Sequence, residues 1–361
     1  MTTLDTRNNV DNGFTVLARS KQESPVVSVI VAMYNNGENG YLRRCLESIE
    51  AQDCDKAEYI LVDDCSDDNT LEIAVNFASG RTDTTVAKLA ENSGPGTARN
   101  VAIGLAHGSY ISALDSDDYV SAGYYNSMCA EAECSGADCI FSEFIQRVDT
   151  GGGTLGSIQS NFPDTSVIGR LTGEKRKSFI IKHGKFGMYR RTIFNDPRNL
   201  YLERMKYEDT PAFIRWVFQI DSISRAEGAC YYYRVNPTSI TQTVTMDPKS
   251  LADRMKSSDL LIDAPKEMGV YEQYRDALDY YYMQVAYFNT LYLIPENEQA
   301  ERIPRLKSHC AERVPNFLRN PYHRRAGAKK RLVESAKWRF PLAAIKVRKA
   351  FRGVKHWLAH K

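Results

Sequence analysis

The fold is decided by the stretch Gly108-Ser109-Tyr110-Ile111-Ser112-Ala113-Leu114-Asp115-Ser116-Asp117-Asp118. A short apolar run ends at Leu114, which is typical of a buried strand. Three carboxylates follow within four residues, where ligands of open α/β sheets bind beyond the strand ends. Crowded carboxylates repel one another, and a hard divalent cation that also bridges to substrate phosphates offsets that repulsion. The stretch Asp115-Ser116-Asp117 therefore predicts an Asp-x-Asp site for a metal and a phosphate-bearing ligand.

The same tripeptide is also typical of a turn or a helix N-cap. The chain before it favours the binding site, because apolar runs alternate there with helical patterns. Strands are predicted at 26–33, 59–62 and 84–89, and helices at 42–49, 71–78 and 95–105. This βαβ succession predicts an α/β fold, with a largely parallel sheet and helices on both of its faces.

Composition places the chain among ordinary globular proteins, and its 361 residues suit one large domain or two smaller ones. The eight cysteines are scattered without a Cys-x-x-Cys pair, so we expect free thiols in a reducing compartment and no zinc site. The first 23 residues do not resemble a signal peptide, and no apolar stretch is long enough to span a membrane. We expect a cytoplasmic protein.

The second half of the chain carries fewer motifs. Residues 149–173 are rich in Gly, Ser and Thr and predict either a loop that closes over a substrate or a disordered insertion without function. Tyr207-Glu208-Asp209 precedes an apolar helix, and mainly helices follow from about residue 248. We predict a disordered segment at 1–24, a catalytic domain at 25–245, a helical region at 246–334 and a basic amphipathic tail at 335–361.

These motifs together resemble the family 2 glycosyltransferases, which have the GT-A fold. The resemblance covers about the first 240 residues. Three stretches carry it in order: Val-Ser-Val-Ile-Val-Ala-Met-Tyr-Asn from Val27, Tyr-Ile-Leu-Val-Asp-Asp-Cys-Ser-Asp-Asp from Tyr59, and the 94–100 turn followed by Leu-Asp-Ser-Asp-Asp from Leu114. Within this family, the sequence most resembles bacterial enzymes that build surface polysaccharides. The resemblance implies transfer of a hexosyl or N-acetylhexosaminyl group from a nucleotide sugar, UDP-linked in our prediction, to a hydroxyl of a glycan or lipid-linked acceptor.

The resemblance also implies roles for single residues. Asp117 and Asp115 bind Mg²⁺ or Mn²⁺, which neutralises the leaving diphosphate. The predicted base that takes the acceptor's proton is Asp209, with Glu208 as the second candidate. Family members of this kind invert the anomeric centre in one displacement. The residues expected at the nucleotide are Ala32, Tyr34, Asp64, Gly94, Arg99, Asp115 and Arg234.

Two other functions remain open. One is a nucleotidyltransferase that makes a nucleotide sugar, although that class needs a basic, glycine-rich loop after the first strand and residues 34–38 contain no basic side chain. The other is a non-catalytic subunit that has kept the GT-A fold. The sequence identifies neither the donor sugar, the acceptor nor the oligomeric state.

Charge is distributed unevenly along the chain. Residues 302–361 hold 18 Lys and Arg but only two acids, Glu312 and Glu334. Val347, Phe351, Val354 and Leu358 form an apolar stripe in this tail, which predicts a basic amphipathic helix on an anionic membrane surface. The alternative is a helix that packs on the enzyme's own acidic body. We expect no nucleic-acid partner and a peripheral position on the inner face of a bacterial cell membrane.

Overall fold

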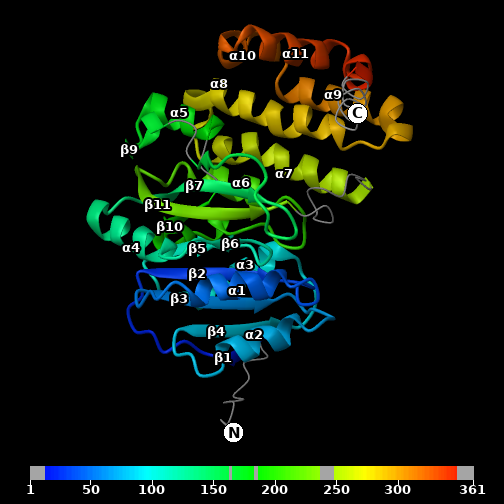
Figure 1. Cartoon of the computed structure of the whole chain (residues 1–361). Helices are drawn as coiled ribbons and strands as arrows, with labels where there is room; N and C mark the ends of the chain where they lie inside the picture. Colours follow the sequence, from blue (N-terminus) through cyan, green and yellow to red (C-terminus); the bar gives the residue numbers. More distant parts are fainter. Residues whose placement is uncertain (1–12, 162–164, 183–185, 236–247, 348–361) are drawn as a thin grey trace. The chain divides into compact units, whose positions relative to one another are not determined.

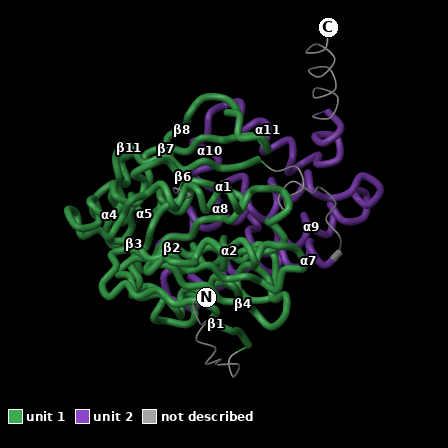
Figure 2. Tube along the Cα trace, turned by 60° about the horizontal axis from the view of Figure 1, so that its bottom comes forward, with its two compact units in different colours: residues 1–236 green, residues 237–361 purple. Residues whose placement is uncertain are grey.

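The computed structural model describes residues 13–161, 165–182, 186–235 and 248–347 (Figure 1). The chain divides into two compact units, residues 1–236 and residues 237–361 (Figure 2). The first unit is built on a sheet with flanking helices, and the second is helical. The boundary after Asn236 falls close to residue 245, where the sequence predicted the end of the catalytic domain.

A mixed sheet organises the first unit, and its main path runs β1-β4-β3-β2-β5-β10-β7-β11-β6. Strands β4, β3, β2 and β5 are parallel, as is the pair β7 and β11, whereas the other pairings are antiparallel. The strands are β1 Phe14–Ala18, β2 Val27–Met33, β3 Ala57–Asp63, β4 Thr84–Leu89, β5 Tyr110–Ala113, β6 Tyr119–Val120, β7 Cys139–Val148, β8 Gln159–Ser160, β9 Gly169–Arg170, β10 Gly187–Arg190 and β11 Ser222–Arg234.

Helices cover both faces of this sheet because its central strands are apolar on both sides. Helices α1, α2 and α4 share one core with the strands, to which Leu46, Ile73 and Met128 belong. Helix α3 packs on β2 and β3 through Ala98 and Ala102, which are fully buried outside that core. The helices are α1 Tyr41–Glu50, α2 Thr70–Ala78, α3 Pro95–Leu105, α4 Tyr124–Ser135, α5 Gly173–Ile181 and α6 Asp209–Trp216.

The strand order reverses between β2 and β5. From β2 the chain builds outward to β3 and β4, and it then returns through α3 to place β5 on the other side of β2. Such a reversal leaves a crevice at the carboxyl ends of the two strands, which is where open α/β sheets bind ligands. The residues just after β2 and β5 therefore meet at a predicted binding position.

Two predictions about irregular segments need correction. Residues 1–24 were predicted to be disordered, but Phe14–Ala18 form the edge strand β1, which pairs antiparallel with β4. The run Phe-Thr-Val-Leu-Ala is mainly apolar but only five residues long, and all five residues are half-buried at the sheet edge. The glycine-rich segment 149–173 also contains regular structure, because β8 pairs with β7 and β9 pairs with β11.

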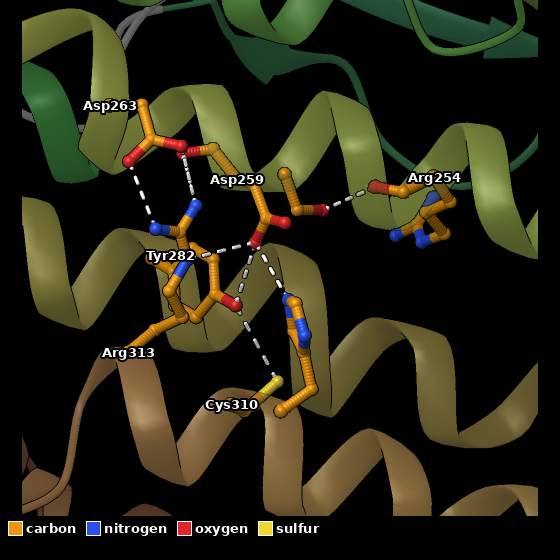
Figure 3. Close-up of polar contacts among 8 residues, drawn as sticks. Arg254, Asp259, Asp263, Tyr282, Cys310 and Arg313 are labelled. Atoms are coloured by element: carbon orange, nitrogen blue, oxygen red, sulfur yellow. Dashed lines mark hydrogen bonds and ion pairs between the residues drawn. The ribbon is translucent and has the colours of Figure 1, made fainter.

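The second unit consists of packed helices with a polar cluster between them (Figure 3). Asp259 accepts hydrogen bonds from Tyr282 and Arg313 and contacts His309, while the Arg313 fork also binds Asp263. These contacts connect α7, α8 and α9. The helices are α7 Pro248–Glu267, α8 Tyr271–Tyr282, α9 Gln299–Arg313, α10 Pro321–Arg325 and α11 Ala328–Arg339, with a π-helical turn at Met283–Asn289.

None of the helices in the described part of the chain has the length and hydropathy of a membrane span. Residues 341–347 continue the predicted basic tail as a helix after α11. The remainder of the predicted apolar stripe, from Phe351 to Leu358, lies outside the described residues.

Candidate active site

The site is built on the loops after β2, β3 and β5 and on the first turn of α3. Asn36, in the loop after β2, donates to the Ser116 hydroxyl at 2.7 Å. The backbone N–H of Asp64, after β3, donates to the Met33 carbonyl. These bonds bring three strand ends together, and they place the Asp115–Asp118 stretch at the reversal of strand order.

Asp64 fixes the turn that starts α3. Its two carboxylate oxygens accept the backbone N–H groups of Ser93 at 2.7 Å and Gly94 at 2.8 Å. Burial raises the pKa of Asp64, and these two hydrogen bonds oppose the shift. Gly94 has φ +87°, a conformation that L side chains rarely adopt, so the turn needs glycine at this position.

Arg99 links the Asp-x-Asp motif to the Glu208–Asp209 motif. Its guanidinium donates to Asp115 Oδ1 at 2.8 Å and also to Glu208 Oε1. The Arg99 and Glu208 side chains are 15% and 9% exposed, whereas that of Asp115 is 40% exposed. The guanidinium also lies over the Tyr201 ring, at 5.3 Å from its centroid. Two motifs far apart in the sequence therefore share one cation that is largely but not fully buried.

The acids of the second motif are in different environments. Glu208 is buried against Arg99, and burial raises its pKa while the nearby guanidinium opposes the rise. Asp209 is exposed at the first turn of α6 and accepts the backbone N–H of Thr210 at 2.8 Å. The Asp209 carboxylate is therefore accessible to a second reactant, whereas the Glu208 carboxylate is not.

The three carboxylates after β5 also differ. Asp118 is buried and accepts the Tyr231 hydroxyl at 2.8 Å and the backbone N–H of Arg234 at 2.7 Å. Burial, followed by repulsion from Asp115, raises the pKa of Asp117 to about 6 in the absence of a cation. This arrangement fits a hard divalent cation, because a cation would offset the repulsion between the two carboxylates and substrate phosphate oxygens could complete its coordination shell.

The protein supplies few ligands to such a cation. The described residues contain no group of three His, Cys, Asp or Glu side chains that could hold a metal. Asp115 and Asp117 alone fit Mg²⁺ or Mn²⁺, which keep water molecules and bind substrate phosphates beside one or two carboxylates. They do not fit a structural zinc site, which requires four protein ligands.

Arg234 is buried and is held by backbone carbonyl groups. Its side chain donates to Asp117 O at 2.8 Å and to Thr150 O at 2.8 Å, and its guanidinium lies 4.6 Å from the Tyr41 ring centroid. Contact between Arg234 and a diphosphate would require some of these bonds to open. Residues 236–241, which follow Arg234 in the sequence and match the same region of the family, lie outside the described residues.

Tyr34 and Ala32 are at the end of β2. Tyr34 follows the strand and is 43% exposed, and Ala32 pairs with Val62 of β3. Both residues lie at the carboxyl end of β2, beside the reversal of strand order. Sequence reasoning missed Tyr231, which accepts the Asp115 N–H and donates to Asp118. The tyrosine-rich run 231–233 was the signal, but its pairing with β6 was needed to interpret it.

Residues 28–196 match the family model for Glycosyl transferase family 2. The chain is 30% identical over 222 residues to the "Uncharacterized glycosyltransferase EpsJ" of Bacillus subtilis, a match that covers 60% of this chain and 63% of that protein. It is 30% identical over 210 residues to the poly(ribitol-phosphate) beta-N-acetylglucosaminyltransferase TarS of Staphylococcus aureus, covering 57% of this chain and 35% of TarS. The chain thus spans less than two thirds of the length of these curated relatives.

The solved structure of TarS residues 1–349, in complex with UDP-GlcNAc, has a similar fold. It superimposes with a TM-score of 0.63 at 22% identity, over 87% of this chain and 91% of that one. The predicted GT-A fold with a helical C-terminal region is thereby confirmed.

Proposed function

Because residues 28–196 match the family model for Glycosyl transferase family 2, we propose that this chain is an inverting, metal-dependent glycosyltransferase. Its donor is a UDP-hexose or UDP-N-acetylhexosamine, and its acceptor is a hydroxyl of a glycan or lipid-linked intermediate in surface-polysaccharide synthesis. The observation that carries the proposal is the Arg99 bridge, which joins the Asp-x-Asp motif to the Glu208–Asp209 motif. One site thus holds both the acids suited to a metal and a candidate base.

Donor binding is proposed at the ends of β2 and β3. Tyr34 offers an exposed ring on which a uracil can stack, and Asp64 lies beside the α3 turn. Backbone N–H groups at a helix start attract anions, so the Gly94 turn suits the nucleotide's phosphate-bearing side. A relative whose solved structure contains UDP-GlcNAc has the same fold, which supports this choice of ligand class.

The reaction chiefly requires stabilisation of the negative charge that develops on the leaving diphosphate. A Mg²⁺ or Mn²⁺ ion bound by Asp117 and Asp115 would supply Lewis-acid stabilisation of the departing diphosphate. Arg99 keeps Asp115 oriented by an ion pair in which the guanidinium is mostly covered and the Asp115 carboxylate is partly exposed. Asp118, held by Tyr231, fixes the backbone that carries Asp117.

Proton removal from the acceptor is assigned to Asp209. A base must reach the acceptor hydroxyl, and an exposed carboxylate is suited to that task. Glu208 is the weaker candidate, because its oxygen is engaged by Arg99. One displacement then transfers the sugar with inversion, and no covalent bond forms between the sugar and the protein.

The experiment is a donor screen that measures released UDP. UDP-hexoses and UDP-N-acetylhexosamines are supplied with Mn²⁺, Mg²⁺ or EDTA, and the anomeric configuration of any product is read by NMR. We expect metal-dependent UDP release with one donor class and an inverted product. Release of pyrophosphate from a nucleoside triphosphate and a sugar phosphate would identify a nucleotidyltransferase. Failure to bind or turn over any donor would identify a non-catalytic subunit.

A further inference from the structure

Exposed apolar side chains are concentrated in one part of the described chain. The large hydrophobic side chains that lie at the surface are Tyr34, Leu155, Ile158, Leu332, Val333, Phe340, Leu342 and Val347. Five of these eight fall within residues 332–347, on α11 and the helical turns that follow it. Single exposed apolar residues are ordinary, but a contiguous group marks an interaction surface.

Helix α11 has an inner and an outer side. Glu334 is buried, and Trp338, four residues later, packs its ring against Tyr287 at 4.9 Å between centroids. Leu332 lies on the opposite side of the helix by the 100° rotation per residue, and it is 72% exposed. Lys329 and Arg339, which lie three residues before and seven residues after Leu332, share this outer side and are exposed. The outer side therefore combines apolar and basic groups.

We use the name α11 face for the exposed apolar and basic side chains of α11 and of the helical turns after it, which are Lys329, Leu332, Val333, Arg339, Phe340, Leu342, Lys346 and Val347. The segment 321–347 contains a single acid, Glu334. That acid is removed from the surface, because His323 contacts its Oε2 at 2.8 Å and Gln284 donates to its Oε1 at 3.1 Å. No acidic side chain of this segment therefore reduces the positive potential of the α11 face.

We propose that the α11 face is a docking surface for an anionic lipid bilayer. Leu332, Phe340 and Val347 would enter the boundary between headgroups and acyl chains, while the basic residues contact anionic headgroups. A nucleic acid or other anionic polymer would use the charges but would leave the exposed leucine and phenylalanine in water. A second copy of the chain would bring the same positive charge to the contact, which disfavours self-association.

This inference rests on the proposed function only for its biological purpose, which is access to a lipid-linked acceptor. The exposed side chains that support it do not depend on that function. It also changes the predicted contact. The sequence placed the membrane contact in the stripe Val347, Phe351, Val354 and Leu358, whereas the described structure presents a basic and apolar surface already from Lys329. The two surfaces are separable by substitution.

The test is co-sedimentation of the full-length protein with vesicles of phosphatidylglycerol and phosphatidylcholine at low salt. Leu332→Ser combined with Phe340→Ser should lower the partition coefficient by about tenfold or more, because two large apolar side chains are lost from the bilayer contact. Lys329→Glu combined with Arg339→Glu should lower it by about fivefold for each positive charge removed. Both effects should disappear with vesicles of pure phosphatidylcholine, to which binding is weak in every variant.

Two matched pairs serve as controls in the same experiment. Leu155→Ser with Ile158→Ser removes exposed apolar groups from the other unit and should leave vesicle binding unchanged. Phe351→Ser with Leu358→Ser tests the stripe predicted from the sequence. UDP release is measured without vesicles, and vesicle binding without substrate, so that failure of the catalytic proposal and failure of this inference are distinguishable.

The proposal is overturned if the wild-type protein stays in the supernatant with anionic vesicles at low salt. It is also overturned if the Phe351 and Leu358 pair abolishes binding while the Leu332 and Phe340 pair does not. Light scattering of each variant without vesicles gives a third test. A change in oligomeric state would overturn the proposal, because it would show that a second copy of the chain occupies the face. Equal circular dichroism spectra and melting temperatures confirm that the variants are folded.

Discussion

Three neighbouring aspartates of this protein differ in their chemistry because they differ in their partners. Asp115 pairs with Arg99, Asp118 accepts two hydrogen bonds in a buried position, and Asp117 keeps a carboxyl whose pKa rises to about 6 without a cation. Their order in the sequence predicted a metal site, but it did not predict these partners. Arg99 and Tyr231 come from other elements, so only the fold could assign a separate task to each acid.

Replacing Asp117 tests the metal assignment. Asp117→Asn should remove most UDP release from the folded enzyme, because a hard cation loses one anionic ligand. The binding of Mn²⁺, measured by electron paramagnetic resonance in the presence of UDP, should weaken in parallel. Asp55→Asn, at an exposed position two residues before β3 begins, is the control and should behave as wild type. Full turnover in Asp117→Asn, with EDTA equally harmless, would exclude a catalytic metal at this position.

Replacing Asp209 and Glu208 separately tests which of the two acids is the catalytic base. Asp209→Asn should lower kcat by roughly two orders of magnitude or more while UDP binding and melting temperature persist, because only the proton acceptor is lost. Glu208→Gln should instead lower stability, by about 1–3 kcal/mol, since it leaves buried Arg99 with one fewer ionic partner. Stability and kcat are measured on both variants. If Glu208→Gln is the inactive, stable variant, the base has been assigned to the wrong acid.

At the scale of elements, the strands buried on both faces were predictable and the antiparallel additions were not. The runs at 27–33 and 57–63 are mainly apolar, which is typical of central parallel strands. Strand β10 has four residues and inserts between β5 and β7, and no pattern in Gly187–Arg190 indicates that insertion. The first half of strand β11, Ser-Ile-Ser-Arg-Ala-Glu-Gly from Ser222, has neither a continuous apolar run nor a strict alternation of polar and apolar residues.

Helix α3 offers a matched pair of glycines that tests how closely the site is packed. A Cβ on Gly96 would lie 2.2 Å from the Leu202 carbonyl oxygen and 3.2 Å from Cγ of Glu208, whereas a Cβ on Gly104 would meet nothing within 4 Å. Gly96→Ala should therefore destabilise the protein by about 1–3 kcal/mol through overpacking, and should reduce kcat because Glu208 and Arg99 shift.

Gly104→Ala is the control on the same helix. It should stabilise the protein by about 0.5–1 kcal/mol, because alanine loses less conformational entropy in a helix than glycine does. Denaturant unfolding and UDP release are measured on both variants. Similar stability and activity for the two would contradict the close approach of α3 to the segment that carries Leu202.

At the scale of the whole molecule, the sequence predicted the first unit better than the second. The motifs of the first unit follow strands in a fixed order, so each could be located at a strand end before the structure was known. The helical unit has no such motif, and its polar cluster joins Asp259, Asp263 and Arg313 over about 50 residues of sequence. Amphipathic spacing predicted helices there but could not predict which polar residues meet, because that depends on tertiary packing.

The edge strand β1 provides a prediction about the molecule as a whole. In the sheet order, β4 and β3 separate β1 from β2, where the proposed site begins. Deleting residues 1–19 should therefore lower stability by about 1–3 kcal/mol, since the ladder between β1 and β4 is lost, while kcat stays within about twofold of wild type. Hydrogen exchange should show faster exchange for amides in β4, which becomes the sheet edge, and no change in β2 or β5.

A shorter deletion, of residues 1–11, isolates the contribution of the strand, because it leaves Phe14–Ala18 in place. Its melting temperature should match that of the full chain. If both deletions leave stability and the protection of β4 unchanged, β1 is not part of the stable sheet in solution, and the sequence-based prediction of a disordered N-terminal segment was right. If the longer deletion abolishes UDP release at a temperature where the protein is folded, the site depends on this far edge, and the separation inferred from the sheet order is wrong.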